Sequence, residues 1–459
     1  MEKKGKFPIS KIAALLLLLL FLAVEFRGLS HLENSDENVY FYMSRLVAEG
    51  KLPYKDFFYA HPPLELLIGA AIFKLFGFSL PMLKLVPLLA MAASGYLVYR
   101  ISGAQFGELA GFLSSAFFLF SYRVLFEATY FTGIALAVFF LLMGFWLMQR
   151  QPLLAGLFFS LAALTRLLSL IPIAVLLGFL LLKRFRTFAA AASVFTAVFL
   201  SANLLLLGLS PDYFVSVYKF HLLKPAAEGN TLQLFAEFAT QNWLPLTAAS
   251  LAIVLWNRRL MVFAAAAGAS LVFLLGLSRI FSFYFLIALP FLAVMAGVAV
   301  DSSLKKLSWQ KYALVAVLLV IAANAAFSIS HLWQFDFAQF KTGQEMADYA
   351  KANSMEGDLI FGDMTSAPLV ALLSGRRIMA DIADTNEMAY LSGVRDIKAE
   401  LELAKRLKPR FFIVRPLYGI GSLRETEQFL TENCHLEKAY KDPLWADFLV
   451  FDCSTNRKA

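Results

Sequence analysis

The chain has 459 residues, of which 59% are hydrophobic and 16% are charged, and its mean hydropathy is +0.67. Soluble globular proteins are nearer about 45–50% apolar and about 25% charged, so a soluble enzyme, a disordered chain and a collagen-like fibre are excluded. The composition predicts a polytopic membrane protein, because apolar runs of roughly 20 residues are what cross a bilayer.

The formal net charge of +8 is not evenly distributed along the chain. Residues 336–459 hold 16 Lys and Arg against 19 Asp and Glu, whereas the first 335 residues hold 25 against 14. The positive excess therefore lies among the apolar runs, where basic residues set membrane topology. We expect no nucleic-acid partner. The N-terminus is basic and then apolar to about Glu25, with no A-x-A-like cleavage site, which predicts a retained signal-anchor.

Eleven apolar runs are predicted to span the membrane, near 10–27, 80–100, 107–122, 129–148, 152–166, 168–183, 187–208, 242–257, 260–277, 281–300 and 311–330. With eleven spans, the basic clusters all fall on one side, which we predict to be the cytoplasm. These clusters are Lys3, Lys4, Lys6 and Lys11, then Arg150, then Lys183, Arg184 and Arg186, then Arg258 and Arg259, then Lys305, Lys306 and Lys311.

The run 63–77 (PLELLIGAAIFKLFG) is also apolar, but as a span it would move every later basic cluster outside. We therefore predict an interfacial or re-entrant helix on the outer face. The predicted organisation is a transmembrane domain over 1–335, with outer loops at 28–79 and 209–241, and a soluble extracytoplasmic domain over 336–459. The protein is then an integral protein of the cell membrane with a cytoplasmic N-terminus.

The last part of the chain changes character, because residues 336–459 are about 28% charged against about 12% before them. Helices are predicted at FAQFKTGQEMADYAKAN and DIKAELELAKRL, and strands at DLIFGD, RRIMAD, RFFIVRP, HLEKAY and FLVFDC. Alternating strands and helices predict a small layered α/β domain. Acids at its strand ends, such as Asp363 and Asp381, are common in any α/β domain and do not by themselves indicate a reactive site.

The first outer loop, HLENSDENVYFYMSRLVAEGKLPYKDFFYAHPPLE, holds the most informative residues. Asp36 and Glu37 follow a span directly, tyrosines and phenylalanines come next, and His61 precedes two prolines. The tyrosines alone are typical of an aromatic belt at the membrane interface. The acid pair, the Gly50–Pro53 turn and the His-Pro-Pro element together indicate more than a solvated loop.

This order of residues resembles the first external loop of GT-C glycosyltransferases, in particular the protein O-mannosyltransferase and aminoarabinose-transferase-like group (glycosyltransferase family 39-like). The segment Ser278–Pro290 (SRIFSFYFLIALP) resembles the arginine, tyrosine and proline element of that family. The resemblance implies a polyprenyl-phosphate sugar as donor and transfer with inversion at the anomeric carbon. It also implies that Asp36 is the catalytic aspartate.

The chemistry of such a transfer needs few groups. A sugar on polyprenyl phosphate already has a good leaving group, so one carboxylate has to deprotonate the acceptor hydroxyl. We assign this role to Asp36, with Glu37 as the carboxylate that positions or tunes it. Cations, tyrosines or a divalent metal would stabilise the departing phosphate.

Eight further residues are predicted to bind substrate. Arg279, with Tyr284 a few residues deeper, is the first choice for the phosphate, although an arginine there also snorkels to lipid headgroups. A charge so close to the bilayer makes Arg166 a functional hypothesis. Glu127 either contacts substrate or pairs with Arg123. The others are Tyr42, His61, Lys219 and His221, which lie in the two outer loops.

Cofactor and acceptor stay open at this point. Asp36, Glu127 and His221 are the residue types that hold a divalent metal, but nothing in their spacing requires one. The acceptor is a lipid, a glycan or a protein hydroxyl, and membrane lipids are expected partners. The alternative function is a transporter or flippase of a lipid-linked substrate, whose site would lie near the bilayer midplane. A third alternative is a non-catalytic membrane scaffold.

The two cysteines, Cys434 and Cys453, are too few for a disulfide framework or a zinc ribbon. They flank two predicted strands joined at an Asp-Pro turn. If Tyr440 faces Asp447 in an antiparallel hairpin, Cys434 faces Cys453 in the same register. We therefore predict a disulfide that closes this hairpin, the alternative being two unpaired small apolar side chains.

Overall fold

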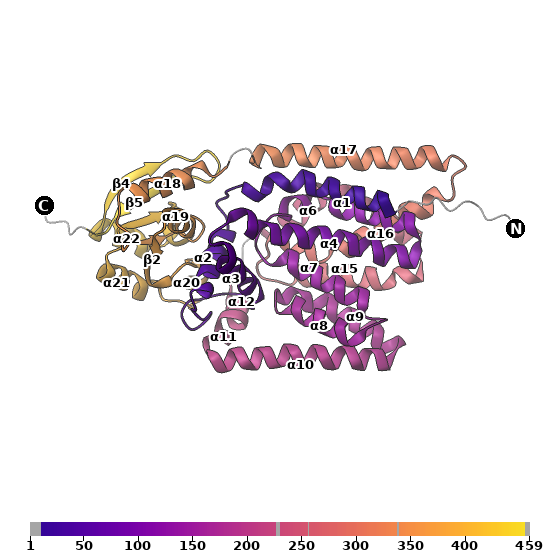
Figure 1. Ribbon diagram of the computed structural model, residues 1–459, viewed down its shortest axis with the longest axis horizontal. Helices are drawn as coiled ribbons and strands as arrows, with labels where there is room; N and C mark the ends of the chain where they lie inside the picture. The colour runs from indigo at the N-terminus through magenta and orange to yellow at the C-terminus, as the bar shows by residue number, and fades with distance from the viewer. Residues whose placement is uncertain (1–10, 226–229, 256, 337–338, 455–459) are drawn as a thin grey trace. The chain divides into compact units, whose positions relative to one another are not determined.

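The computed structural model describes residues 11–225, 230–255, 257–336 and 339–454 (Figure 1). The predicted flank residues Lys3, Lys4 and Lys6 lie outside the described residues, as do residues 10 and 256 of two predicted spans. Packing groups the chain into two compact units. The first comprises Met1–Leu29, Lys84–Asn203 and Ala227–Phe335, and the second comprises Ser30–Leu83, Leu204–Ala226 and Asp336–Ala459. Packing therefore groups residues 30–79 of the first predicted outer loop and residues 209–225 of the second with the tail, whereas residues 230–241 of the second loop belong to the first unit. The division at residue 335 stays a prediction about membrane and soluble parts.

The first unit is helical, and its helices run roughly parallel or antiparallel to one another (Figure 1). Its elements are α1 (Lys11–Glu25), η1 (Phe26–Ser30), α4 (Leu80–Phe106), α5 (Glu108–Leu119), α6 (Tyr122–Glu127), α7 (Ile134–Leu147), α8 (Pro152–Ala163), η2 (Leu167–Ser169), α9 (Leu170–Lys183), α10 (Phe185–Leu209), α13 (Asn230–Gln241), α14 (Trp243–Val254), η4 (Arg258–Leu260), α15 (Met261–Leu275), η5 (Ser282–Ile287), α16 (Leu289–Leu304) and α17 (Gln310–Asp336).

The described residues contain five helices that are long and apolar enough to cross a membrane, and six shorter apolar helices. Each of these eleven overlaps one predicted span, so the prediction of a polytopic α-helical membrane protein with about eleven spans is confirmed. Peripheral helices keep their apolar side chains on the surface, since only 6% of the most apolar stretch of α10 is buried. Such a surface suits lipid rather than water.

Small residues let the central helices of this unit approach one another. A side chain at Gly297 of α16 would place its Cβ 2.4 Å from the backbone nitrogen of Ser114 in α5. Only glycine fits at that distance, which is how membrane helices bring their backbones together.

The second unit contains the predicted α/β domain. Its sheet has the order β2-β1-β3-β5-β4, from β1 (Leu359–Gly362), β2 (Arg377–Ile378), β3 (Phe411–Val414), β4 (His435–Tyr440) and β5 (Phe448–Asp452). Strands β2, β1 and β3 are parallel, and β5 is antiparallel to both β3 and β4. The helices and 3₁₀ turns are α18 (Lys341–Ala352), α19 (Ala367–Ser374), η6 (Met379–Asp381), α20 (Glu387–Leu391), α21 (Ile397–Leu407), η7 (Gly419–Ser422) and α22 (Arg424–Asn433).

Helices cover both faces of this sheet. Neighbouring residues of a strand point to opposite faces, and Phe411 contacts Tyr349 of α18 whereas Phe412 contacts Phe429 of α22. The layered α/β prediction is confirmed, because each of the five predicted strands and both predicted helices is present.

The final hairpin has the predicted disulfide between Cys434 and Cys453, whose Cα atoms are 4.3 Å apart. The predicted register holds where His435 pairs with Asp452. A bulge beyond Leu436 then shifts the pairing by one residue, so Tyr440 faces Phe448 and not Asp447. The irregularity lies toward the turn, so it leaves the cysteines opposed.

The first outer loop and the first part of the second complete the second unit. The first forms α2 (Glu37–Ala48) and α3 (Leu64–Phe76), which pack on each other. This part of the second loop forms α11 (Asp212–Phe214), the π-helical turn η3 (Val215–Lys219) and α12 (Phe220–Leu223), and the rest of that loop forms α13 in the first unit. The predicted helix at 63–77 is confirmed as α3, whose 13 residues are short for a bilayer crossing. Its place at the membrane interface stays a prediction.

Candidate functional site

Asp36 and Glu37 lie at the beginning of α2. Asp36 is the residue before the first helical turn, it is partly exposed, and its side chain does not cap the helix. Glu37 begins the helix and is fully buried. A carboxylate in the first turn is stabilised by the helix dipole. Asp36 is therefore the more accessible of the two acids, and the roles of base and supporting carboxylate stay predictions.

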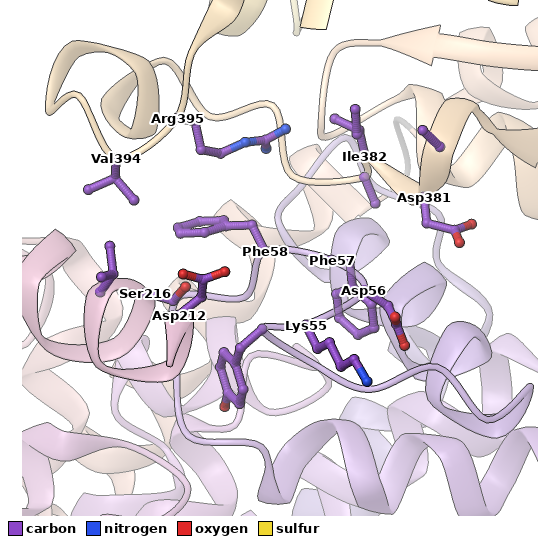
Figure 2. Close-up of a pocket in the computed structure, with 14 residues that line it drawn as sticks. Lys55, Asp56, Phe57, Phe58, Asp212, Ser216, Asp381, Ile382, Val394 and Arg395 are labelled. Carbon is purple, nitrogen blue, oxygen red and sulfur yellow. The ribbon is translucent and has the colours of Figure 1, made fainter. Parts of the chain in front are cut away.

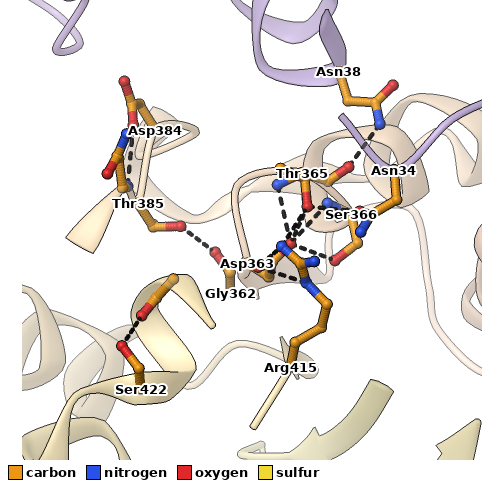
Figure 3. Close-up of polar contacts among 12 residues, drawn as sticks. Asn34, Asn38, Gly362, Asp363, Thr365, Ser366, Asp384, Thr385, Arg415 and Ser422 are labelled. Atoms are coloured by element: carbon orange, nitrogen blue, oxygen red, sulfur yellow. Dashed lines mark hydrogen bonds and ion pairs between the residues drawn. The ribbon is translucent and has the colours of Figure 1, made fainter. Parts of the chain in front are cut away.

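The segment that carries Asp36 is held from both sides by one residue of the tail. Asn38 donates from its side-chain amide to the backbone oxygen of Thr365 at 2.6 Å and to that of Glu33 at 2.7 Å. The amide of Asn34 lies 2.6 Å from Thr365 Oγ1. Asn34 and Asn38 stand two residues before and after Asp36, so Thr365 anchors the chain on either side of the predicted base (Figure 3).

Thr365 is in turn held by a buried ion pair. Arg415 donates from Nε and Nη2 to Asp363 Oδ2, at 3.2 and 3.1 Å, and from Nη2 to Thr365 Oγ1 at 3.0 Å. Asp363 is fully buried, and its Oδ1 accepts from the backbone nitrogens of Thr365 and Ser366 at 3.0 and 3.1 Å (Figure 3). A buried charge requires such a complete set of partners.

The position of this ion pair follows from the sheet topology. Asp363 and Arg415 directly follow β1 and β3, which are adjacent and parallel. In the sheet order β2-β1-β3-β5-β4, the chain passes from β1 to β2 on one side and from β3 to β4 on the other. The carboxyl ends of β1 and β3 therefore form a topological switch point, the usual ligand crevice of an open α/β sheet. In this chain the crevice is occupied by Asn34 and Asn38 of the first loop.

Sequence reasoning missed these anchoring residues. It treated Asp363 as an ordinary strand-end acid and did not consider Thr365 or Arg415. The available signal was an acid and an arginine, each directly after a predicted strand. The glycine directly before Asp363 was a second signal. In the structure Gly362 has a φ of +138°, and a Cβ at this position would lie 1.8 Å from the backbone oxygen of Ile413, so only glycine fits.

The structure brings His61 and His221 together. Their rings stack with centroids 5.3 Å apart, and His221 Nε2 lies 2.8 Å from the backbone oxygen of Ala60. Tyr54 donates to the backbone oxygen of His61 at 2.7 Å. Burial raises the pKa of Tyr54 well above its usual value, so this hydroxyl stays protonated and keeps donating. The first and second outer loops therefore meet at a histidine pair that residue spacing did not predict.

The other two loop residues differ in exposure. Tyr42 is 1% exposed, and its hydroxyl accepts from the backbone nitrogen of Ile378 at 2.8 Å. Its observed contact is structural, and its predicted contact with substrate stays a prediction. Lys219 is exposed at the end of the π-helical turn η3. Such turns often mark functional positions.

In the first unit, the segments of the remaining predicted residues pack on one another. Element η5 contains Tyr284 and begins three residues after Arg279. It contacts α6, whose last residue is Glu127, and it also contacts η2, which begins directly after Arg166. Arg166 is 2% exposed and donates to the backbone oxygen of Thr132. The alternative pairing of Glu127 is confirmed, because Arg123 Nη1 lies 3.4 Å from its carboxylate.

Lys84 is a further buried cation of this unit that sequence reasoning missed. It lies in α4 with no exposed surface, and its Nζ is 5.8 Å from the ring centroid of Tyr130. A fully buried lysine in a membrane helix marks a functional position by default. The signal was a lysine within an otherwise apolar predicted span.

A cavity of about 310 Å³ opens in the second unit between the two outer loops and the tail (Figure 2). Its walls carry Lys55, Asp56, Asp212, Asp381 and Arg395. The guanidinium of Arg395 lies 5.7 Å from the ring centroid of Phe58, also in the wall. Asp36 is not among the lining residues, so this polar cavity does not hold the predicted base.

Among the described residues, one group has the spacing of a metal site. Ligand atoms of His435, Glu437 and Asp452 lie within 4.8 Å of one another. Arg410 already pairs with both carboxylates, at 3.0 Å from Glu437. Burial raises the pKa of Asp452, but hydrogen bonds from Ser454 and Arg410 outweigh it, and the net pKa is below the usual value. The group is therefore an ion-pair network, and the predicted set of Asp36, Glu127 and His221 stays untested.

The fold of the whole chain is similar to that of ArnT from Cupriavidus metallidurans. The apo structure aligns with a TM-score of 0.68 and 16% identity, covering 97% of this chain and 98% of that one. ArnT bound to undecaprenyl phosphate aligns with a TM-score of 0.66 and 18% identity, covering 96% and 98%.

The oligosaccharyltransferase from Archaeoglobus fulgidus, in complex with Zn and sulfate, aligns with a TM-score of 0.60 and 12% identity, covering 96% of this chain and 73% of that one. The same enzyme, AglB, with an inhibitory peptide and a dolichol-phosphate aligns with a TM-score of 0.58 and 10% identity, covering 96% and 74%. No protein-family model and no curated protein matches the sequence. ArnT and AglB are GT-C glycosyltransferases, so the chain has the predicted GT-C fold.

Proposed function

From the GT-C fold of this polytopic membrane protein, we propose that the chain is an inverting glycosyltransferase. It moves a sugar from a polyprenyl-phosphate donor to an acceptor hydroxyl at the outer face of the cell membrane. Two observations together support the proposal. The fold is similar to that of ArnT over 97% of the chain, and Asp36 is a partly exposed acid held in place at the start of α2.

In the proposed reaction, the carboxylate of Asp36 takes the proton of the acceptor hydroxyl. The acceptor oxygen then attacks the anomeric carbon from the face opposite the phosphate. The bond between that carbon and the phosphate oxygen breaks, and polyprenyl phosphate departs with the electron pair. A positioned base contributes about 10²–10⁴-fold to such a step.

Buried cations support the phosphate side of the reaction. Lys84 and Arg166 are buried in the first unit, and Arg279 belongs to the segment that packs near Arg166 through η2 and η5. We assign these three to the donor phosphate, because desolvated cations stabilise developing negative charge more strongly than exposed ones. Undecaprenyl phosphate in the ArnT structure and dolichol-phosphate in the AglB structure support a lipid phosphate as leaving group.

The loop residues are assigned to the sugar and the acceptor. The His61–His221 stack and Lys219 present donors and an aromatic surface from both outer loops. Tyr284, 7% exposed in η5, is assigned to the donor beside Arg279. Thr365 and Arg415 are positioning residues, since they act on Asp36 through Asn34 and Asn38.

The test is a screen of the purified full-length chain against polyprenyl-phosphate sugars, with released polyprenyl phosphate as the readout. Once a donor is found, Asp36→Asn is expected to lower turnover by about 10²–10⁴-fold with donor binding retained. The matched control is Asp348→Asn, which removes an exposed carboxylate from α18 and is expected to leave turnover unchanged. Near-normal turnover in Asp36→Asn would remove Asp36 from this role.

The same screen separates the proposal from the alternatives. A transporter or flippase would move labelled lipid across a vesicle membrane without releasing polyprenyl phosphate, and a scaffold would do neither. A divalent metal is tested in the same assay by removal with a chelator and re-addition.

A further inference from the structure

The first unit has a second polar region, a cavity of about 400 Å³. It lies where α1 and α5 begin and where α4 and α7 end. That end of the helices carries the basic clusters that predict the cytoplasmic side, whereas the proposed transfer uses the opposite one. The proposed reaction therefore leaves this cavity without a role.

The cavity is basic and its cations are already oriented. Lys11, Arg100 and Arg150 line it against a single acid, Glu108. The guanidinium carbons of Arg100 and Arg150 lie 4.9 and 5.3 Å from the ring of Trp146, so one indole holds both. Within the part of the chain that the structure describes, neither arginine forms an ion pair with a carboxylate.

Arg100 is fixed by a second aromatic residue. Its Nη1 donates to the hydroxyl of Tyr96 at 2.6 Å, and its guanidinium carbon lies 5.6 Å from the Tyr96 ring. Aromatic faces orient a guanidinium without neutralising it, so its remaining N–H groups stay available to an anion. The planar fork of arginine suits phosphate oxygens in particular.

The cavity continues onto an apolar surface. Ala14, Leu15 and Leu18 of α1 also line it, and Leu15 is 55% exposed. A basic cavity that borders exposed apolar side chains between membrane helices matches a lipid, whose charged headgroup lies next to its acyl chains. A free anion would use only the basic part.

We propose that this cavity binds the phosphate of an anionic phospholipid headgroup, with one acyl chain along the exposed face of α1. Arg100 and Arg150 hold the phosphate, Lys11 adds charge at the rim, and Trp146 keeps the two guanidinium groups in place. The proposal does not depend on the proposed glycosyltransferase activity.

The experiment is native mass spectrometry of the full-length protein in detergent, titrated with phosphatidylglycerol or phosphatidylcholine. We expect one tight phosphatidylglycerol adduct, weakened about tenfold or more in the Arg100→Gln/Arg150→Gln double variant. The matched control is Arg184→Gln/Arg186→Gln, which removes two exposed arginines from the same predicted side and is expected to retain the adduct. The charge-preserving double variant Arg100→Lys/Arg150→Lys is expected to retain part of the affinity.

Three outcomes overturn the proposal. If Arg184→Gln/Arg186→Gln weakens the phosphatidylglycerol adduct as much as Arg100→Gln/Arg150→Gln does, the lipid is attracted to exposed basic residues in general and not to this cavity. An adduct of phosphatidylcholine as tight as that of phosphatidylglycerol would show that charge does not select the ligand. Glycerol phosphate competing as strongly as the lipid would assign the cavity to a free anion. If the glutamine variant fails to fold, the same decision rests on the lysine variant and on the competition with glycerol phosphate.

Discussion

Tyr42 shows how one buried polar contact joins the first loop to the tail of the second unit. Its hydroxyl accepts the backbone N–H of Ile378 at 2.8 Å, where strand β2 ends. An N–H left without this acceptor in the interior costs about 1–3 kcal/mol. The contact therefore stabilises the second unit independently of any role in binding.

Replacing Tyr42 by Phe is expected to lower the free energy of unfolding by about 1–3 kcal/mol. The matched control is Tyr312→Phe, which removes a hydroxyl from a side chain that is 78% exposed and is expected to change little. Thermal unfolding in detergent, followed by tryptophan fluorescence, measures both. Equal stability of the two variants would contradict a structural role for the Tyr42 hydroxyl.

The same residue predicts a pH dependence. Burial raises the pKa of Tyr42 to about 12, and the hydrogen bond from Ile378 lowers it only in part. The unfolded value is about 10, so the folded state holds the proton more tightly. The contribution of Tyr42 to stability is then complete below pH 10 and is lost as the pH rises from 10 to about 12. The decline in stability over this range is expected to be shallower in Tyr42→Phe.

At the scale of elements, the beginning of α2 depends on the end of β1. Thr365→Val keeps the shape of the side chain but removes the hydroxyl that joins Asn34, Asp363 and Arg415. Backbone amides of residues 33–40 are then expected to exchange with solvent deuterium about tenfold faster or more, because each 1.4 kcal/mol of lost local stability is a factor of ten. Hydrogen–deuterium exchange mass spectrometry of the full chain measures this.

The control for this change is Thr431→Val on the exposed side of α22, which is expected to leave that exchange unchanged. If an active donor is known, Thr365→Val should lower turnover more than donor binding, whereas Thr365→Ser should restore it. Unaltered exchange at residues 33–40 in Thr365→Val would mean that the tail does not hold α2.

The final hairpin is the second element whose stability can be tested. Its disulfide joins residues 19 apart, and closing a loop of about that length removes about 3 kcal/mol of unfolded-state entropy. Cys434→Ala/Cys453→Ala is therefore expected to lower the stability of the α/β domain by about 3 kcal/mol in chemical denaturation. Non-reducing peptide mass spectrometry of the parent protein should show the linked pair. A loss below about 1 kcal/mol would mean that the buried hairpin packing is sufficient by itself.

At the scale of the whole molecule, orientation in the membrane is the open prediction. Both cysteines of the chain are in the disulfide, so a single introduced cysteine can be labelled selectively. Glu402→Cys, on the exposed side of α21, is expected to react with an impermeant maleimide in intact cells. Lys306→Cys, after α16, is expected to react only after permeabilisation. The parent protein is the unlabelled control.

The reverse labelling pattern would place the tail in the cytoplasm. It would mean that α3 crosses the membrane despite its 13 residues, or that the basic clusters do not set the topology. In either case the proposed transfer would move to the cytoplasmic face, and the basic cavity would face outward.

The sequence alone predicted the helices and strands of this protein and its disulfide. Eleven apolar runs, five short strands and the paired cysteines are local patterns, and local patterns are determined by backbone geometry and the hydrophobic effect. The proposal of Asp36 as the base likewise rests on its neighbours in the first loop. The register near Tyr440 was wrong by one residue, because a bulge has no distinct local pattern.

Only the tertiary structure decided which distant residues meet. Asn38 and Thr365 are 327 positions apart, and His61 and His221 are 160 apart. The burial of Lys84 depends likewise on helices from other parts of the chain. Contacts of this kind depend on how strands order within a sheet and how loops pack on it, and neither is encoded in the spacing of neighbouring residues. The sequence was therefore sufficient to propose Asp36 as the catalytic base, but not to identify the tail residues that hold its segment in position.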